Sequence, residues 1–360
     1  MEQSSILNLE NTLAEIENLQ PGFTFEKVDI ESEIQSRSAI YTGLGIKILS
    51  VFGGLVGTLF FLGFLGVAIM NSAEASMIFG VIFIIAALLI HKVSKSILLD
   101  TSTVCVYLSG FVLVAIGCDK IDLGENFIIG VISIISLAGL FLSRSFVLAF
   151  LSVLIFNGSL IAFLKHNHAH NFTPALLVYV TVVFVWLTLW EHRLIMGTSI
   201  ISNIYNPLRS AFLFSLIAVL SLYSEGFYDK PIVYPYISSL LMIVAILLIL
   251  NIVFSSLGIV KLQNKLVYFL GSCVILAPML FAPAILGALL IILISFQFGH
   301  RTGFALGLAA FIYFVSRYYY DLSYTLLVKS EILMLSGVLF LLAFLLVRKK
   351  LSIANQALLL

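Results

Sequence analysis

Long runs of apolar residues, separated by only a few polar ones, occupy almost the whole chain after Lys47. A helix needs about 20 apolar residues to cross the hydrocarbon core of a bilayer, and about twelve such stretches can be placed here. They lie near residues 46–70, 76–90, 98–118, 126–142, 146–164, 174–190, 208–223, 236–256, 265–282, 284–299, 303–319 and 326–347. The pattern predicts an all-α, polytopic transmembrane helical bundle. The break at Pro283 is the weakest boundary, because a proline can also kink one longer helix.

The composition excludes a soluble domain. Hydrophobic residues make up 61% of the chain and charged residues 10%, whereas an ordinary soluble protein carries about 25% charged residues. Three cysteines are too few for a disulfide scaffold. The sequence holds no H-E-x-x-H, G-x-S-x-G or Walker A motif. We therefore expect no enzyme activity, no catalytic residue, no cofactor, no metal and no nucleic-acid partner.

Three segments are expected along the chain. Residues 1–44 form an acidic arm, in which Ile6, Leu9, Leu13 and Ile16 have the spacing of a short amphipathic helix. Residues 45–350 form the transmembrane domain, and residues 351–360 form a short tail. The lipid bilayer is the main expected partner, and the acidic arm is a candidate binding segment for another protein.

Basic residues indicate the orientation, because Lys and Arg are enriched in cytosolic loops. With twelve spans and a cytosolic N-terminus, the cytosolic side holds Lys27, Arg37, Lys47, Lys92, Lys95, Arg144, Arg193, Arg209, Lys261, Lys265, Arg301, Arg348, Lys349 and Lys350. The outer side holds only Lys120, Lys165, Lys230 and Arg317. We therefore expect both termini in the cytosol.

Glycines crowd the first span, and Gly53 and Gly57 have small-xxx-small spacing. Small residues let two helix backbones approach closely in lipid. This spacing predicts tight packing inside the bundle, with a dimer face or a hinge as the alternatives.

Ionisable residues at membrane depth are costly and often functional. Asp100 lies just inside the third span, where it could cap the helix N-terminus or form a cation or proton site. Lys329 and Glu331 lie on the last span; two positions apart, they point about 200° from each other and cannot pair together. Glu331 is the stronger functional candidate, with a structural hydrogen bond as its alternative, because Lys329 can reach the interface along its own stem.

Other polar groups have simpler interpretations. Asn157 is expected to bond a neighbouring helix, and Glu191-His192-Arg193 reads as charge at the membrane boundary. His166, His168 and His170 alternate in an outer loop. On an extended segment they would share one face and could form a weak metal site, but a solvated loop is the interpretation we favour.

The C-terminal stretch supports a family assignment. Arg317-Tyr-Tyr-Tyr-Asp-Leu-Ser-Tyr-Thr-Leu-Leu-Val-Lys-Ser330, Ser336-Gly337 and Arg348-Lys-Lys350, together with the glycine-rich opening span, resemble a bacterial family called domain of unknown function 4401. The resemblance covers about residues 35 to 350. It implies a bacterial inner-membrane protein but brings no established activity. It also implies that Tyr319, Asp321, Thr325, Lys329 and Ser330 form one unit. Arg317 and Asp321 are four apart and could pair if their helix continues that far.

Two functions remain open from the sequence. The first is a non-enzymatic scaffold, sensor or assembly partner, which the polar arm and the scarcity of interior charge favour. The alternative is a transporter or permease-like protein that moves a small solute or ion along a polar path lined by Glu331, Lys329 and Asp100.

Overall fold

The structure is a computed structural model that describes residues 52–64, 66–67, 72–90, 97–143, 145–196, 199–224, 235–256, 269–273 and 276–321, with residues 331, 334 and 341. Within these ranges the chain is helical, with no strand, so the all-α class is confirmed. The acidic arm, the tail and most of the last predicted span lie outside the described residues.

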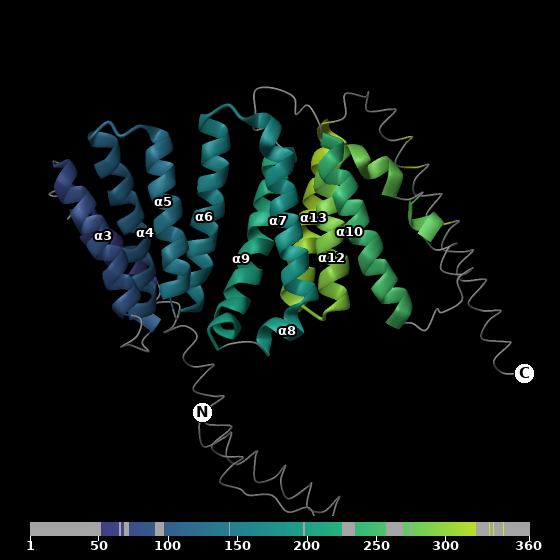
Figure 1. Ribbon diagram of the computed structural model, residues 1–360, viewed down its shortest axis with the longest axis horizontal. Helices are drawn as coiled ribbons and strands as arrows, with labels where there is room; N and C mark the ends of the chain where they lie inside the picture. Colours follow the sequence, from purple (N-terminus) through teal and green to yellow (C-terminus); the bar gives the residue numbers. More distant parts are fainter. Residues whose placement is uncertain are drawn as a thin grey trace, which may run out of the picture.

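The helices lie side by side in a broad array, as Figure 1 shows. They are α3 (Ala73–Ile90), α4 (Ile97–Lys120), α5 (Glu125–Leu142), α6 (Phe146–His166), α7 (Thr173–Leu189), α8 (Glu191–Ile195), α9 (Ser199–Ser224), α10 (Pro235–Ser256), α12 (Pro283–Gln297) and α13 (Arg301–Asp321). Two 3₁₀ helices, η1 (His170–Phe172) and η2 (Ala277–Phe281), join longer elements, and residues 52–64 form a further apolar helix.

Six of the described helices are long and apolar enough to cross a membrane, and three apolar helices are shorter. This supports a membrane protein, while the count of about twelve spans stays a prediction. Many large apolar side chains are exposed along these helices, such as Phe60, Ile82 and Ile134. Such a surface would be unfavourable in water but matches a lipid environment. At Pro283 the chain leaves η2 through Ala282, whose φ of −128° and ψ of 68° are not helical, and α12 begins.

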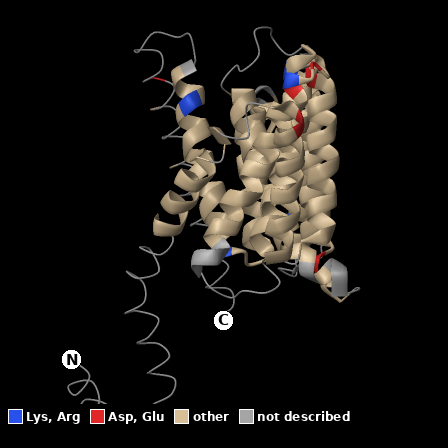
Figure 2. Cartoon of the chain, turned by 90° about the vertical axis from the view of Figure 1, so that its left-hand side faces the viewer, with Lys and Arg blue, Asp and Glu red and all other residues tan. Residues whose placement is uncertain are grey.

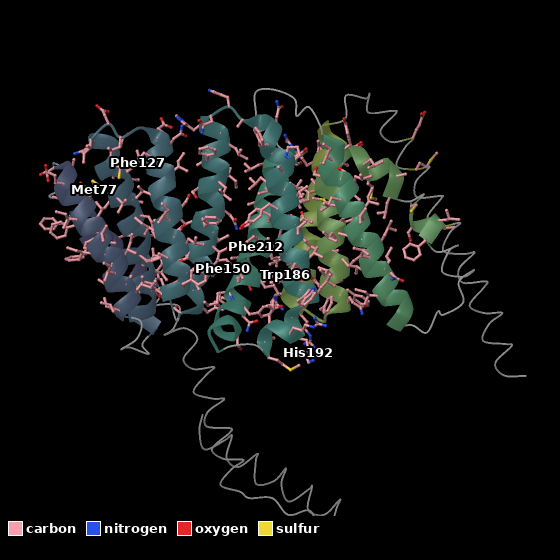
Figure 3. The ribbon with its side chains drawn as sticks, viewed as in Figure 1. Met77, Phe127, Phe150, Trp186, His192 and Phe212 are labelled. Atoms are coloured by element: carbon pink, nitrogen blue, oxygen red, sulfur yellow. The ribbon has the colours of Figure 1, made fainter. Side chains whose placement is uncertain are left out.

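The core consists of two apolar clusters. One joins α3, α4, α5 and α6 around Tyr107 and Phe111, and the other joins α6, α7, α9, α10, α12 and α13 around Leu216 and Ile291. The two halves meet where α6 packs against α9. There the ring of Phe150 meets that of Phe214 edge-on, with 5.5 Å between centroids; Figure 3 labels Phe150 and its neighbour Phe212 at this seam.

The closest helix packing is between α3 and α4, not at the first span. A Cβ atom built on Gly80 would lie 2.8 Å from the carbonyl oxygen of Gly110, so both positions need glycine. By contrast, a Cβ atom on Gly53, Gly57 or Gly63 would meet no described atom within 4 Å. The expected tight packing of these three glycines is therefore not seen among the described residues.

Many buried polar side chains form hydrogen bonds within and between helices, whereas Oδ1 of Asn157 and the hydroxyls of Thr173, Tyr205 and Tyr223 are buried without a described partner. Asn157 of α6 donates a hydrogen bond to Ser215 of α9 over 2.9 Å, as expected for this residue. The hydroxyls of Tyr107 and Ser152 lie 2.7 Å apart and link α4 to α6. Because no water is present in a bilayer core, such bonds hold neighbouring helices in register.

Charged residues gather at the two ends of the array, and the middle of the helices carries none, as Figure 2 shows. We call the end near α8 the basic end, since it holds Arg193, Arg209 and Arg301. The opposite, acidic end holds Glu74, Asp119, Asp122 and Glu125, together with Lys120, Lys165 and Arg317.

Candidate functional site

The predicted polar residues are only partly described. Asp100 is helical and belongs to α4, whose described part begins at Ile97. Its side chain lies outside what the structure describes, so the helix-cap and ion-site interpretations both stay predictions. Glu331 is helical and exposed. Thr325, Lys329 and Ser330 lie outside the described residues, so neither their proposed unit nor a path along Glu331, Lys329 and Asp100 can be followed.

Arg317, Tyr319 and Asp321 share the last turns of α13, which continues through Asp321. The predicted Arg317–Asp321 pair required that the helix continue as far as Asp321, and the backbone does so. The rings of Tyr319 and Tyr320 meet edge-on with 5.7 Å between centroids. This group lies at the acidic end, where tyrosines are common at a membrane boundary.

A more compact polar site lies at the basic end, where three separate connections of the chain converge. Glu191 is in the first turn of α8, Arg209 is in α9, and His300 is in the turn between α12 and α13. α8 lies at the lower edge of the array, where Figure 3 labels His192 beside this cluster. The three side chains come from positions up to 109 residues apart.

The turn that carries His300 is set by local bonds. Gly299 has a φ of +71°, a left-handed conformation that favours glycine after a helix end. The backbone N–H of His300 then donates to the carbonyl oxygen of Ser295 over 2.8 Å. This folds the turn back over α12 and directs His300 toward α8 and α9.

Ion pairs and hydrogen bonds join the three side chains. Oε1 of Glu191 lies 3.3 Å from Nη1 of Arg209, and Oε2 lies 2.8 Å from Nε2 of His300. Nη1 of Arg209 lies near both ring nitrogens of His300, 2.5 Å from Nε2 and 3.0 Å from Nδ1. In a neutral ring whose Nε2 donates to Glu191, only Nδ1 can accept from the guanidinium. The side chains of Arg209 and His300 are each 18% exposed and that of Glu191 is 23% exposed, so the cluster is largely shielded from solvent.

Aromatic rings flank the cluster. The guanidinium of Arg209 lies 5.6 Å from the ring centroid of the buried Tyr205, one turn earlier on α9. The guanidinium of Arg193 lies 4.5 Å from the ring centroid of Trp190. Both distances suit cation–π attraction. The stacked rings hold the two arginines against α8 and α9.

A small polar cavity adjoins the cluster, with a volume of about 20 Å³. Its walls are Phe184 and Thr188 of α7, Arg209, Ser210 and Leu213 of α9, Ser295 of α12, and His300, Thr302 and Gly303 at the start of α13. About 10–15 Å³ is enough for one water molecule. The cavity therefore has room for one or two atoms or molecules of the size of water.

The acidic end shows a looser arrangement. Nδ1 of His166 lies 2.5 Å from Oε2 of Glu125, but these side chains are 37% and 66% exposed. Asn126 and Asn167 exchange two hydrogen bonds of 3.0 and 2.7 Å beside them.

The histidine run does not form the extended segment that a shared face would need. His166 ends α6, His168 has a φ of +51°, and His170 begins η1. Across the part of the chain that the structure describes, no group of three His, Cys, Asp or Glu side chains is placed to hold a metal ion.

Sequence reasoning missed the site at the basic end. It read Glu191 as boundary charge and left His300 without a role. One available signal was the placement of Arg209 at the edge of an apolar span, since a charge there needs a partner. The identity of that partner could not be read, because it lies in a distant turn.

Comparisons with known proteins agree with the resemblance seen in the sequence. The family described as "Domain of unknown function (DUF4401)" matches residues 44–350. No curated protein and no solved structure gives a significant match. The match spans the glycine-rich opening helix, the whole array and the C-terminal tyrosine stretch, and it leaves the acidic arm outside. The chain is therefore a member of the DUF4401 family.

Proposed function

We propose that this protein is a non-enzymatic membrane sensor or assembly scaffold whose ligand-responsive site is the Glu191–Arg209–His300 cluster. It would reside in the bacterial inner membrane, with the basic end and both termini in the cytosol. The carrying observation is the position of the cluster. It joins α8, α9 and the α12–α13 turn at one end of the array.

The surroundings of the cavity support a closed site. On its membrane side the walls include Phe184 and Leu213, both buried. Deeper along the same helices, Val180, Leu216 and Ile291 are buried. The buried hydroxyls at this depth already have partners: Thr181 donates to the carbonyl of Leu177, and Ser215 accepts from Asn157. A group in the cavity could change how α8, α9 and the α12–α13 turn pack.

The charge distribution supports the orientation. Among the described residues each end carries three basic side chains, so the orientation rests on the sequence, in which further lysines such as Lys92, Lys95 and Lys261 fall in connections predicted on the α8 side. Under the positive-inside rule the basic end faces the cytosol. The acidic arm of residues 1–44 would then lie on the same side and could bind a partner protein. Deletion of residues 1–36 should release such a partner, and its retention by the shortened chain would contradict this role of the arm.

A thiol-accessibility experiment tests the closed site without knowledge of any ligand. Cys105, Cys118 and Cys273 are first replaced by serine or alanine. Single cysteines are then placed at Ser210, in the cavity wall, and at Thr181, buried deeper on α7. Membrane vesicles of each orientation are treated with a charged, water-soluble thiol reagent.

We expect Ser210→Cys to react from the basic end alone and Thr181→Cys to resist the reagent from both sides. A transporter with alternating access would instead expose one position to both sides in turn. Labelling of either cysteine from both sides would therefore reject the sensor or scaffold proposal in favour of a transport path.

A further inference from the structure

We infer that the cavity at the basic end is a binding site for one small monovalent anion of the halide class. This inference rests on the proposed function only for its water access from the basic end. Four features of the cavity carry it: backbone donors, hydroxyl donors, a guanidinium and a restricted volume.

The first feature is the N-terminus of α13, which forms one wall through Thr302 and Gly303. The N–H of Phe304 donates to the carbonyl oxygen of His300 over 2.9 Å. The N–H groups of Arg301, Thr302 and Gly303 precede this bond, and within the described part of the chain they have no backbone acceptor. Free N–H groups and the positive end of the helix dipole attract an anion.

The second feature is a set of hydroxyl groups on three helices. Ser295 of α12 lines the cavity and is 3% exposed, yet no described residue accepts or donates a hydrogen bond at its hydroxyl. The hydroxyls of Ser210 and Thr302 also line the cavity without a described partner. Thr188 differs, because it donates to the carbonyl of Phe184 over 2.8 Å. A buried hydroxyl without a partner is costly, so a bound acceptor would stabilise Ser295.

The third feature is Arg209, which has more donors than its neighbours accept. A guanidinium carries five N–H groups. Glu191 and His300 contact it at Nη1, and the ring of Tyr205 lies beside the guanidinium. Glu191 does not line the cavity, although its carboxylate contacts Arg209 and His300, which do. The cavity therefore presents donors and hydroxyls but no carboxylate.

The fourth feature is the volume of about 20 Å³. It suits one monatomic anion or one to two waters, given about 10–15 Å³ for a single water. A water molecule both donates and accepts, whereas a halide only accepts. The surplus of donors favours the halide.

The test compares thermal unfolding of the full-length protein in lipid nanodiscs in potassium chloride and in potassium gluconate at equal ionic strength. Gluconate is too large for the cavity. We expect a saturable rise in Tm with chloride, because a ligand that binds only the folded state stabilises it. Ser295→Ala should weaken the chloride dependence by roughly tenfold, and Thr302→Val should weaken it less.

Ser221→Ala is the matched control, since this α9 hydroxyl donates to its own helix at Ile217 and does not line the cavity. It should leave the chloride dependence unchanged. A Tm that is the same in chloride and gluconate would overturn the inference and assign the cavity to water. An equal loss in Ser221→Ala and Ser295→Ala would also overturn it. The thiol experiment uses no chloride, so the two proposals can fail separately.

Discussion

The two ends of this membrane protein each pair a histidine with a glutamate, but the pairs differ in setting. At the acidic end, Glu125 begins α5 and His166 ends α6, the next helix along the chain, and both side chains are open to solvent. At the basic end, Glu191 and His300 come from distant connections, are largely shielded, and share Arg209. The first pair lies on the surface between two consecutive helices. The second pair, with Arg209, joins α8, α9 and the α12–α13 turn.

The physical difference is solvent. An ion pair in water gains little, because solvent and salt screen both charges. A shielded cluster is different, since removing one partner leaves the other charge without compensation. The same residue types can therefore contribute almost nothing to stability at one end of the array and hold helices together at the other.

Glu191→Gln should have the largest effect. It removes the shared carboxylate and leaves Arg209 and His300 facing each other. We expect the unfolding free energy to fall by about 2–3 kcal/mol, less than the roughly 3–5 kcal/mol of a fully buried pair, because these side chains keep some exposure to solvent. Unfolding in mixed detergent micelles measures this loss. A change below about 0.5 kcal/mol, the size expected of an exposed pair, would show that the cluster is not a structural joint.

The pairwise energy should also differ between the ends. A double-mutant cycle with Glu191→Gln and His300→Gln should give a coupling of about 1–2 kcal/mol. The matched cycle with Glu125→Gln and His166→Gln should give less than about 0.5 kcal/mol. Equal coupling energies in the two cycles would show that the shielded pair is no stronger than the exposed one.

Glu125→Gln alone should have the smallest effect, below about 0.5 kcal/mol. The exposed His166 can turn to water, and the Asn126–Asn167 hydrogen bonds remain. Raising the salt concentration should shrink this effect further because exposed charges are screened. A loss as large as that of Glu191→Gln would mean that the acidic end is packed more tightly than its exposure indicates.

The sequence predicted the fold better than the site. Continuous apolar runs located most helices closely, as for α10, expected at 236–256 and observed at Pro235–Ser256. α9 was expected at 208–223 but begins at Ser199. Hydropathy marks where the chain is apolar, and a helix can continue beyond that stretch into polar residues.

The site could not be predicted in the same way. Its residues are 91 and 109 positions apart, and a single sequence carries no direct signal for such contacts. The histidine run shows the opposite error. Regular alternation suggested an extended segment, but the helix end at His166 and the turn at His168 separate the side chains. Local sequence patterns predicted the helices well. They predicted poorly the side-chain clusters that form between residues far apart in the sequence.

The central claim is that the basic end holds a closed anion site and does not open a path across the membrane. Chloride efflux from proteoliposomes loaded with the purified protein tests this most directly. The account predicts efflux no faster than from protein-free vesicles, together with the chloride-dependent rise in Tm. Chloride efflux above that background, abolished by Arg209→Gln in protein that still folds, would contradict it and identify the cavity as part of a transport route.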